Sequence, residues 1–93
     1  MTTPSSEEVF EIVKRHLTEI VTEIDPAVVT PEGNMKELGA SSLDIVEVVS
    51  CSMRELRVRV PRSELSTLKD IGGLVDLLHR TKLAKDAEAG AGA

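Results

Sequence analysis

Apolar residues recur every three or four positions near the start of the chain, which is the spacing of one buried face of an α-helix. They are Val9, Ile12, Val13, Leu17, Ile20, Val21 and Ile24. Ser5 and Glu8 have the spacing of a capping box at the start of this segment. Because Pro26 cannot continue a helix, the pattern predicts a first amphipathic helix that stops just before it.

The next segment predicts a long irregular loop, since Pro31, Gly33 and Asn34 interrupt any regular structure up to about Gly39. Long ordered loops need anchors. The apolar residues of this loop are therefore expected to pack onto the helices and to fix the approach to Ser42. They are Val28, Val29, Met35 and Leu38.

A second helix is predicted from Ser42 to about Leu56. Its core-facing stripe on a helical wheel consists of Ile45, Val46, Val49, Met53 and Leu56. Leu43 lies off this stripe and is predicted to face solvent. The same exposed side carries Glu47, Ser50 and Arg54, with Asp44 nearby. Single exposed leucines are common in soluble proteins, so Leu43 is either an ordinary surface residue or part of a binding surface.

The last third of the chain predicts an extended stub before Pro61, a short helical turn over residues 63–68 and a final helix capped by Asp70. The final helix is expected to bury Ile71, Leu74, Val75 and Leu78, and its negative C-terminal end suits His79, Arg80 and Lys82. Gly72 and Gly73 weaken its first turn and indicate either close packing or flexibility. Residues 84–93 hold too little apolar surface to order and are predicted to be a disordered tail.

The composition limits both size and setting. Ninety-three residues suffice for one small domain, and 41% hydrophobic content with a single aromatic, Phe10, predicts a small aliphatic core. One cysteine, Cys51, excludes an internal disulfide, and no Cys/His cluster has metal-binding spacing, so a reducing cytoplasm fits best. The chain shows no signal peptide and no apolar run long enough for a membrane span.

The net charge of −5 is concentrated in the first half of the chain, so nucleic acid is not expected as a partner, and neither is a membrane. The acidity serves either ordinary solubility or attraction to basic partner surfaces.

No catalytic constellation is legible in the sequence. His16 falls on the apolar face of the first helix, where a packed histidine is expected, and His79 is explained by a helix end. Cys51 lies within the second helix away from any basic cluster and is expected to be an inert small side chain. A hydrolase that uses Ser42 lacks a histidine base near it in sequence. We therefore expect a protein that is not an enzyme.

The junction "LGASSLDIVEVV" offers a different chemistry. The N-terminus of a helix presents unpaired amides and a partial positive charge, which favour a phosphate carried by Ser41 or Ser42. On local chemistry alone, the alternative that both serines are only helix caps is favoured.

These residues resemble the acyl carrier protein family, whose members carry a modified serine in a Gly-x-Asp-Ser-Leu context at the start of the second helix. Here Gly39, Ser42 and Leu43 occupy the matching places, and Ser41 replaces the Asp. The resemblance implies an all-α, four-helix bundle with a long first loop and a short third helix. It also implies that Ser42 receives phosphopantetheine from coenzyme A through a separate phosphopantetheinyl transferase. The acyl carrier domain would span residues 6–83, between a flexible N-terminus at 1–5 and the tail.

A narrower resemblance connects "MRELRVRVPRSEL" and "KDIGGLVDLL" with the stand-alone donor carriers of polyketide β-branching cassettes. It rests on Met53, Leu56, Val58, Val60, Pro61, Glu64, Leu65, Ile71, Gly72, Leu74 and Val75. It implies a monomeric carrier that is loaded by an acyltransferase or decarboxylase and delivers acetyl to a hydroxymethylglutaryl-synthase-like enzyme.

The interface with such partners would be Leu43, Asp44, Glu47, Ser50 and Arg54. Because Ser41 and Arg54 reduce the negative charge usual on this face, attraction to generic basic partners should be weaker. A discrete carrier for another starter or extender unit, and an unmodified helical adaptor, are the alternatives.

Overall fold

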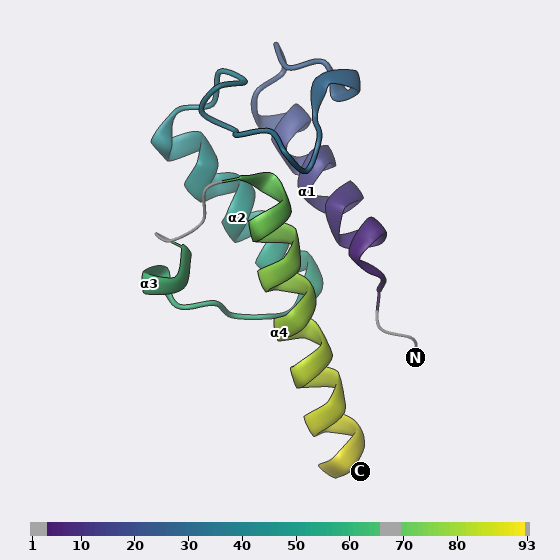
Figure 1. The fold of residues 1–93 in the computed structure, drawn as a ribbon. Coiled ribbons are helices and arrows are strands. Elements are labelled where there is room, and N and C mark those ends of the chain that lie inside the picture. Colours follow the sequence, from purple (N-terminus) through teal and green to yellow (C-terminus); the bar gives the residue numbers. More distant parts are fainter. Residues whose placement is uncertain (1–3, 66–69, 93) are drawn as a thin grey trace.

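The computed structural model of the protein describes residues 4–65 and 70–92. Its elements, in chain order, are α1 (Ser6–Ile20), the 3₁₀-helix η1 (Pro26–Val28), α2 (Ser42–Leu56), α3 (Arg62–Leu65) and α4 (Ile71–Gly92). Helix α1 packs against both α2 and α4, and the long loop between α1 and α2 covers one end of the bundle (Figure 1). The predicted all-α, four-helix class is confirmed. Helix α3 is the predicted short third helix, and the second half of the predicted turn lies outside the described residues.

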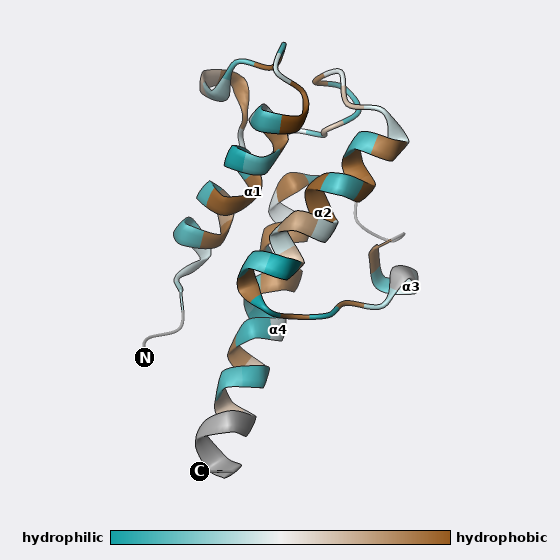
Figure 2. Cartoon of the chain, turned by 180° about the vertical axis from the view of Figure 1, so that it is seen from behind, coloured by the Kyte–Doolittle hydropathy of each residue, from teal (hydrophilic) through white to brown (hydrophobic). Residues whose placement is uncertain are grey.

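The core is aliphatic and is shared by the three long helices. Its buried members are Val9, Val13, Leu17, Ile24, Val29, Ala40, Val48, Val49, Leu56, Val58, Val60, Ile71, Leu74, Val75, Leu77 and Leu78. In Figure 2 hydrophobic residues line the side of α1 that faces α2 and α4, while hydrophilic residues cover its outer side. The apolar positions predicted for α4 are all buried.

The predicted core stripe of α2 is wrong at one position. Val46 is 54% exposed, whereas Val48 is fully buried and was not assigned to the stripe. The buried stripe includes Ser52, whose hydroxyl donates a hydrogen bond of 2.8 Å to the Val48 carbonyl oxygen and so needs no water. A wheel that counts only apolar residues misses Ser52, and it therefore places the stripe too far toward Val46.

Helix α1 starts as predicted and ends earlier than predicted. The Ser5 hydroxyl accepts a hydrogen bond from the Glu8 N–H at 3.3 Å. The helix stops at Ile20, and the Val21 N–H closes the last turn on the Leu17 carbonyl oxygen at 2.9 Å. The three consecutive β-branched residues at 20–22 have low helix propensity, which ends α1 before any proline is reached.

The long loop is anchored at both the core and the start of α4. Val29 is buried, and Met35 and Leu38 pack against the core as predicted, but Val28 is 53% exposed and does not. The loop also supplies partners for two amides of α4, since Ile71 N–H and Gly72 N–H donate to the carbonyl oxygens of residues 33 and 31 at 2.9 and 2.7 Å.

Asp70 caps α4 as predicted, because its Oδ1 accepts a hydrogen bond from the Gly73 N–H at 2.7 Å. The choice between close packing and flexibility at Gly72 is settled for close packing. A Cβ atom at Gly72 would lie 2.9 Å from the Pro31 carbonyl oxygen, too close for any other residue without a shift of the backbone.

Helix α4 corrects the prediction for the C-terminal part of the chain. It continues to Gly92, so residues 84–92 are helical and the basic residues expected at its end lie in its middle. An ion pair one turn apart, between Lys82 and Asp86 at 3.3 Å, joins the extension to the preceding turn. The segment contains no proline and several alanines, which favour helix without any buried face. Within the described ranges, no helix is both long and apolar enough to cross a membrane.

Candidate functional site

The approach to α2 is a tight turn built around Gly39. Its φ of +113° lies in a region that L side chains rarely adopt. The Gly39 N–H donates to the Lys36 carbonyl oxygen at 3.1 Å, and the Ala40 N–H donates to the Met35 carbonyl oxygen at 3.0 Å. Because Ala40 is 5% exposed, it anchors the turn in the core just before the two serines.

Ser41 is the N-cap of α2 and takes part in a complete capping box. Its hydroxyl oxygen accepts a hydrogen bond from the Asp44 N–H at 3.1 Å, and the Asp44 carboxylate accepts one from the Ser41 N–H at 3.0 Å. Both side chains therefore satisfy backbone groups that the start of a helix leaves unpaired.

Ser42, the first residue of α2, is in a different situation. Its side chain is exposed, and in the described part of the chain its hydroxyl makes no hydrogen bond. The hydroxyl lies at the positive end of the helix dipole, where a phosphate group is favoured. The two serines therefore have distinct environments: Ser41 caps the helix, and Ser42 leaves its hydroxyl exposed.

The predicted packed histidine, His16, lies far from Ser42. Its Nε2 atom is 2.8 Å from a carboxylate oxygen of Glu55, which also pairs with the Arg15 guanidinium. The hydrogen bond from Arg15, supported by that from His16, lowers the pKa of Glu55 below its usual range. Ser42 and Glu55 are at opposite ends of the 15-residue α2, about 20 Å apart along its axis. His16 therefore cannot serve as a base for Ser42.

The other two candidate side chains, His79 and Cys51, are both partly buried in helices. His79 is partly buried in the middle of α4, not at its end. Cys51 is partly buried within α2.

The exposed side of α2 contains the residues that the sequence predicted for it. Leu43 is 72% exposed, and Glu47, Ser50 and Arg54 are exposed along the same side. Asp44 differs, since it is half-buried and its carboxylate belongs to the capping box.

Sequence reasoning missed one residue of this surface. Val46 lies one turn after Leu43, so the two exposed side chains form an apolar pair beside Ser42. The spacing of one helical turn between Leu43 and Val46 could have indicated it from the sequence.

Comparison with known proteins agrees with this geometry. Residues 15–78 match the family described as "Phosphopantetheine attachment site". The chain is 35% identical over 71 residues to the polyketide biosynthesis acyl-carrier-protein AcpK of Bacillus subtilis, an alignment that covers 76% of this chain and 87% of that protein. It is also 32% identical over 76 residues to an acyl carrier protein of Helicobacter acinonychis, covering 81% of this chain and 96% of the other.

Among solved structures, the fold matches a chain in the crystal structure of the curacin biosynthetic pathway HMG synthase in complex with acetyl donor-ACP. The TM-score is 0.75 at 34% sequence identity, and the match covers 83% of this chain and 99% of that chain. From the exposed serine at the start of α2 and these matches, we conclude that the chain belongs to the acyl carrier protein family, whose members carry a covalent phosphopantetheine group and catalyse no reaction themselves.

Proposed function

We propose that Ser42 holds the phosphopantetheine group and that the protein delivers acetyl to a hydroxymethylglutaryl-synthase-like enzyme during polyketide β-branching. The observation that carries the proposal is the exposed, unpaired hydroxyl of Ser42 at the first position of α2. Ser41 is bound to Asp44, so it is the poorer acceptor of the two.

The residues around Ser42 suit a phosphodiester. The helix dipole of α2 places partial positive charge beside the hydroxyl. Ser41 is uncharged where many carriers have Asp, so only Asp44 places negative charge in the first turn. The Asp44 carboxylate accepts a hydrogen bond from the Ser41 N–H, which directs part of its charge toward the backbone. When bound, the group supplies a flexible arm whose terminal thiol holds an acyl group as a thioester.

Two similarities support the acetyl donor role. The B. subtilis relative is a carrier of polyketide biosynthesis by name. The solved complex pairs an HMG synthase with an acetyl donor-ACP. This 93-residue chain covers 99% of the matched chain, so the matched chain is small, as expected for a carrier protein. The proposed partners are therefore a phosphopantetheinyl transferase, a loading acyltransferase or decarboxylase, and the synthase-like enzyme.

We assign partner contact to the exposed side of α2 that starts beside Ser42. Leu43 and Val46 offer apolar area, and Glu47, Ser50 and Arg54 offer polar contacts around it. Apolar centres with polar rims are typical of specific protein interfaces.

The attachment is tested by intact mass after incubation with a broad-specificity transferase and coenzyme A. Wild type and Ser41→Ala should gain the mass of one phosphopantetheine group, while Ser42→Ala should gain none. Ser41→Ala is the matched control, since it loses a cap worth about 1 kcal/mol yet keeps the acceptor hydroxyl. Modification of Ser42→Ala would exclude Ser42 as the attachment point, and no gain in wild type would indicate an unmodified adaptor.

The cargo is tested by loading the modified protein with acetyl, malonyl or propionyl groups and measuring transfer by a hydroxymethylglutaryl-synthase-like enzyme. Transfer should be fastest from the acetyl form. Preference for another group would instead indicate a carrier of a different starter or extender unit.

A further inference from the structure

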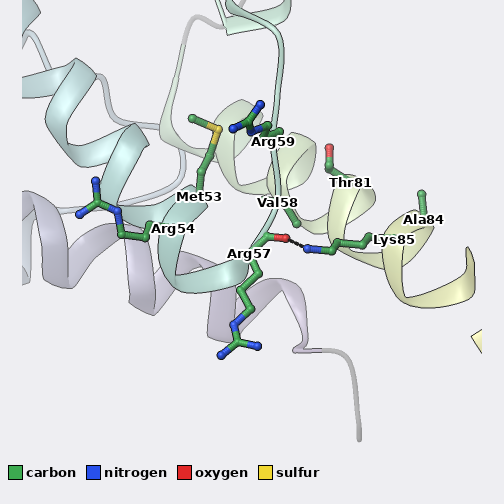
Figure 3. A pocket seen from close by; sticks show the side chains of 8 residues that line it. All are labelled: Met53, Arg54, Arg57, Val58, Arg59, Thr81, Ala84 and Lys85. Atoms are coloured by element: carbon green, nitrogen blue, oxygen red, sulfur yellow. Dashed lines mark hydrogen bonds between the residues drawn. The ribbon is translucent and has the colours of Figure 1, made fainter. Parts of the chain in front are cut away.

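A groove of about 610 Å³ lies where the C-terminal end of α2 meets α4, at the opposite end of α2 from Ser42 (Figure 3). It is lined by Met53, Arg54, Arg57, Val58, Arg59, Thr81, Ala84 and Lys85. We call it the basic groove, because four of these residues are exposed cations and none is acidic. The uncharged residues give it a partly apolar lining.

The chain builds this groove from a helix end and an extended segment. Helix α2 ends at Arg57, which has the left-handed conformation with φ 58° and ψ 43°. The Val58 N–H then donates to the Met53 carbonyl oxygen at 3.0 Å. Val58 and Val60 are buried while Arg59 between them is exposed, the alternation of an extended segment.

Thr81, Ala84 and Lys85 of α4 form the other wall. The Lys85 ammonium donates a hydrogen bond to the Arg57 carbonyl oxygen, as the dashed line in Figure 3 shows. This contact joins the extended part of α4, which was predicted to be disordered, to Arg57 at the end of α2. The extension of α4 is therefore a structural part of the groove.

Among the described side chains, the acids next to the groove in sequence are paired elsewhere. Glu55 is next to Arg54 in sequence, but Arg15 and His16 hold its carboxylate on the α1 side. Asp86 is next to Lys85, but it pairs with Lys82 at 3.3 Å. In the described part of the chain, none of the arginine side chains at positions 54, 57 and 59 forms an ion pair. In a protein of net charge −5, this is a concentrated site for an anionic partner.

The placement of the guanidinium groups favours an extended anion over a compact one. Figure 3 shows Arg57 and Arg59 pointing in opposite directions, with Arg54 to one side. This divergent placement suits carboxylates spaced along a peptide, each pairing with one guanidinium group, better than it suits one compact phosphate.

We propose that the basic groove is a second docking site that binds an acidic segment of a partner protein. The carboxylates of the segment pair with Arg54, Arg57 and Arg59, and one aliphatic side chain of the segment covers the partly buried Met53. The proposal does not depend on modification of Ser42, and it shares only Arg54 with the exposed side of α2.

Fluorescence anisotropy with the full chain at low ionic strength tests this. The probe is a short labelled peptide of Asp and Glu with one central Leu. Arg57→Gln with Arg59→Gln should weaken binding about tenfold, the loss expected for two exposed charge pairs. The matched control is Lys36→Gln with Arg80→Gln, which removes the same charge from exposed positions outside the groove and should change binding less than twofold. Thermal unfolding of both variants verifies that they fold.

The location of binding gives an independent readout. Amide chemical shifts should move at Met53, Val58, Thr81 and Ala84 when the peptide is added. Equal losses in the two double variants, shifts confined to other residues, or equal binding of the peptide with Gln in place of its acids would each overturn the proposal. Tighter binding of a DNA duplex or of phosphatidylserine vesicles than of the peptide would overturn it as well, in favour of a different anionic ligand.

Discussion

The exposed Leu43 separates the contribution of α2 to folding from its contribution to partner binding. Full burial of a leucine side chain is worth about 1.5–3 kcal/mol. Leu43 is 72% exposed, so only about a quarter of that free energy, roughly 0.5 kcal/mol, is available to the isolated fold. Leu43→Ala should therefore reduce the free energy of unfolding by about 0.5 kcal/mol in urea titrations.

The effect on a partner should be much larger. If the partner covers the remaining surface of Leu43, the variant loses about 1–2 kcal/mol of binding, which is about 5- to 30-fold in kcat/KM for acyl transfer. Leu74→Ala is the matched control, because Leu74 is 1% exposed in the core and its truncation should cost about 2–5 kcal/mol of stability. A Leu43→Ala protein that unfolds as readily as Leu74→Ala, or that transfers acyl groups at the wild-type rate, would refute this reasoning.

Two further changes test the turn before α2 and the ion pairs at its other end. Gly39→Ala should lower the free energy of unfolding by about 1–3 kcal/mol in urea, because the φ of +113° is strained for alanine although a Cβ there would meet no atom within 4 Å; unchanged stability would show that the turn relaxes. Because Arg15 lowers the pKa of Glu55, the charged carboxylate stabilises the fold above the usual carboxyl pKa, and this contribution is lost as the pH falls through the lowered pKa. Glu55→Gln should therefore be less stable than wild type at neutral pH and should approach it in strong acid, and a difference that does not vary with pH would contradict the assignment.

The sequence predicted the features that depend on neighbours in the chain. The caps at Ser5 and Asp70 and the start of α2 at Ser42 were all correct, since a cap is recognised by residues within one turn. The exposure of Leu43 followed from helical periodicity alone.

The errors at Val46 and at the end of α4 have physical causes that cannot be read from the spacing of apolar residues. The apolar pattern places Val46 in the core because it does not include Ser52, a polar residue that is buried and bonded to its own helix. The apolar pattern ends α4 too early because it contains only the residues that form a buried face, whereas the Lys82–Asp86 ion pair and a high alanine content also favour helix. The basic groove combines residues 53–59 with residues 81–85, so no local motif could have predicted it.

The hydrogen bonds between the long loop and the start of α4 couple the motions of these two parts of the chain. Ile71 and Gly72 donate their amides to the carbonyl oxygens of Gly33 and Pro31, so neither amide can exchange with solvent until the loop lifts away. The same loop ends at the turn before Ser42, so a fluctuation that frees the loop should also affect that turn. The exchange rates of these two amides therefore report how often the loop that leads to Ser42 leaves its native position.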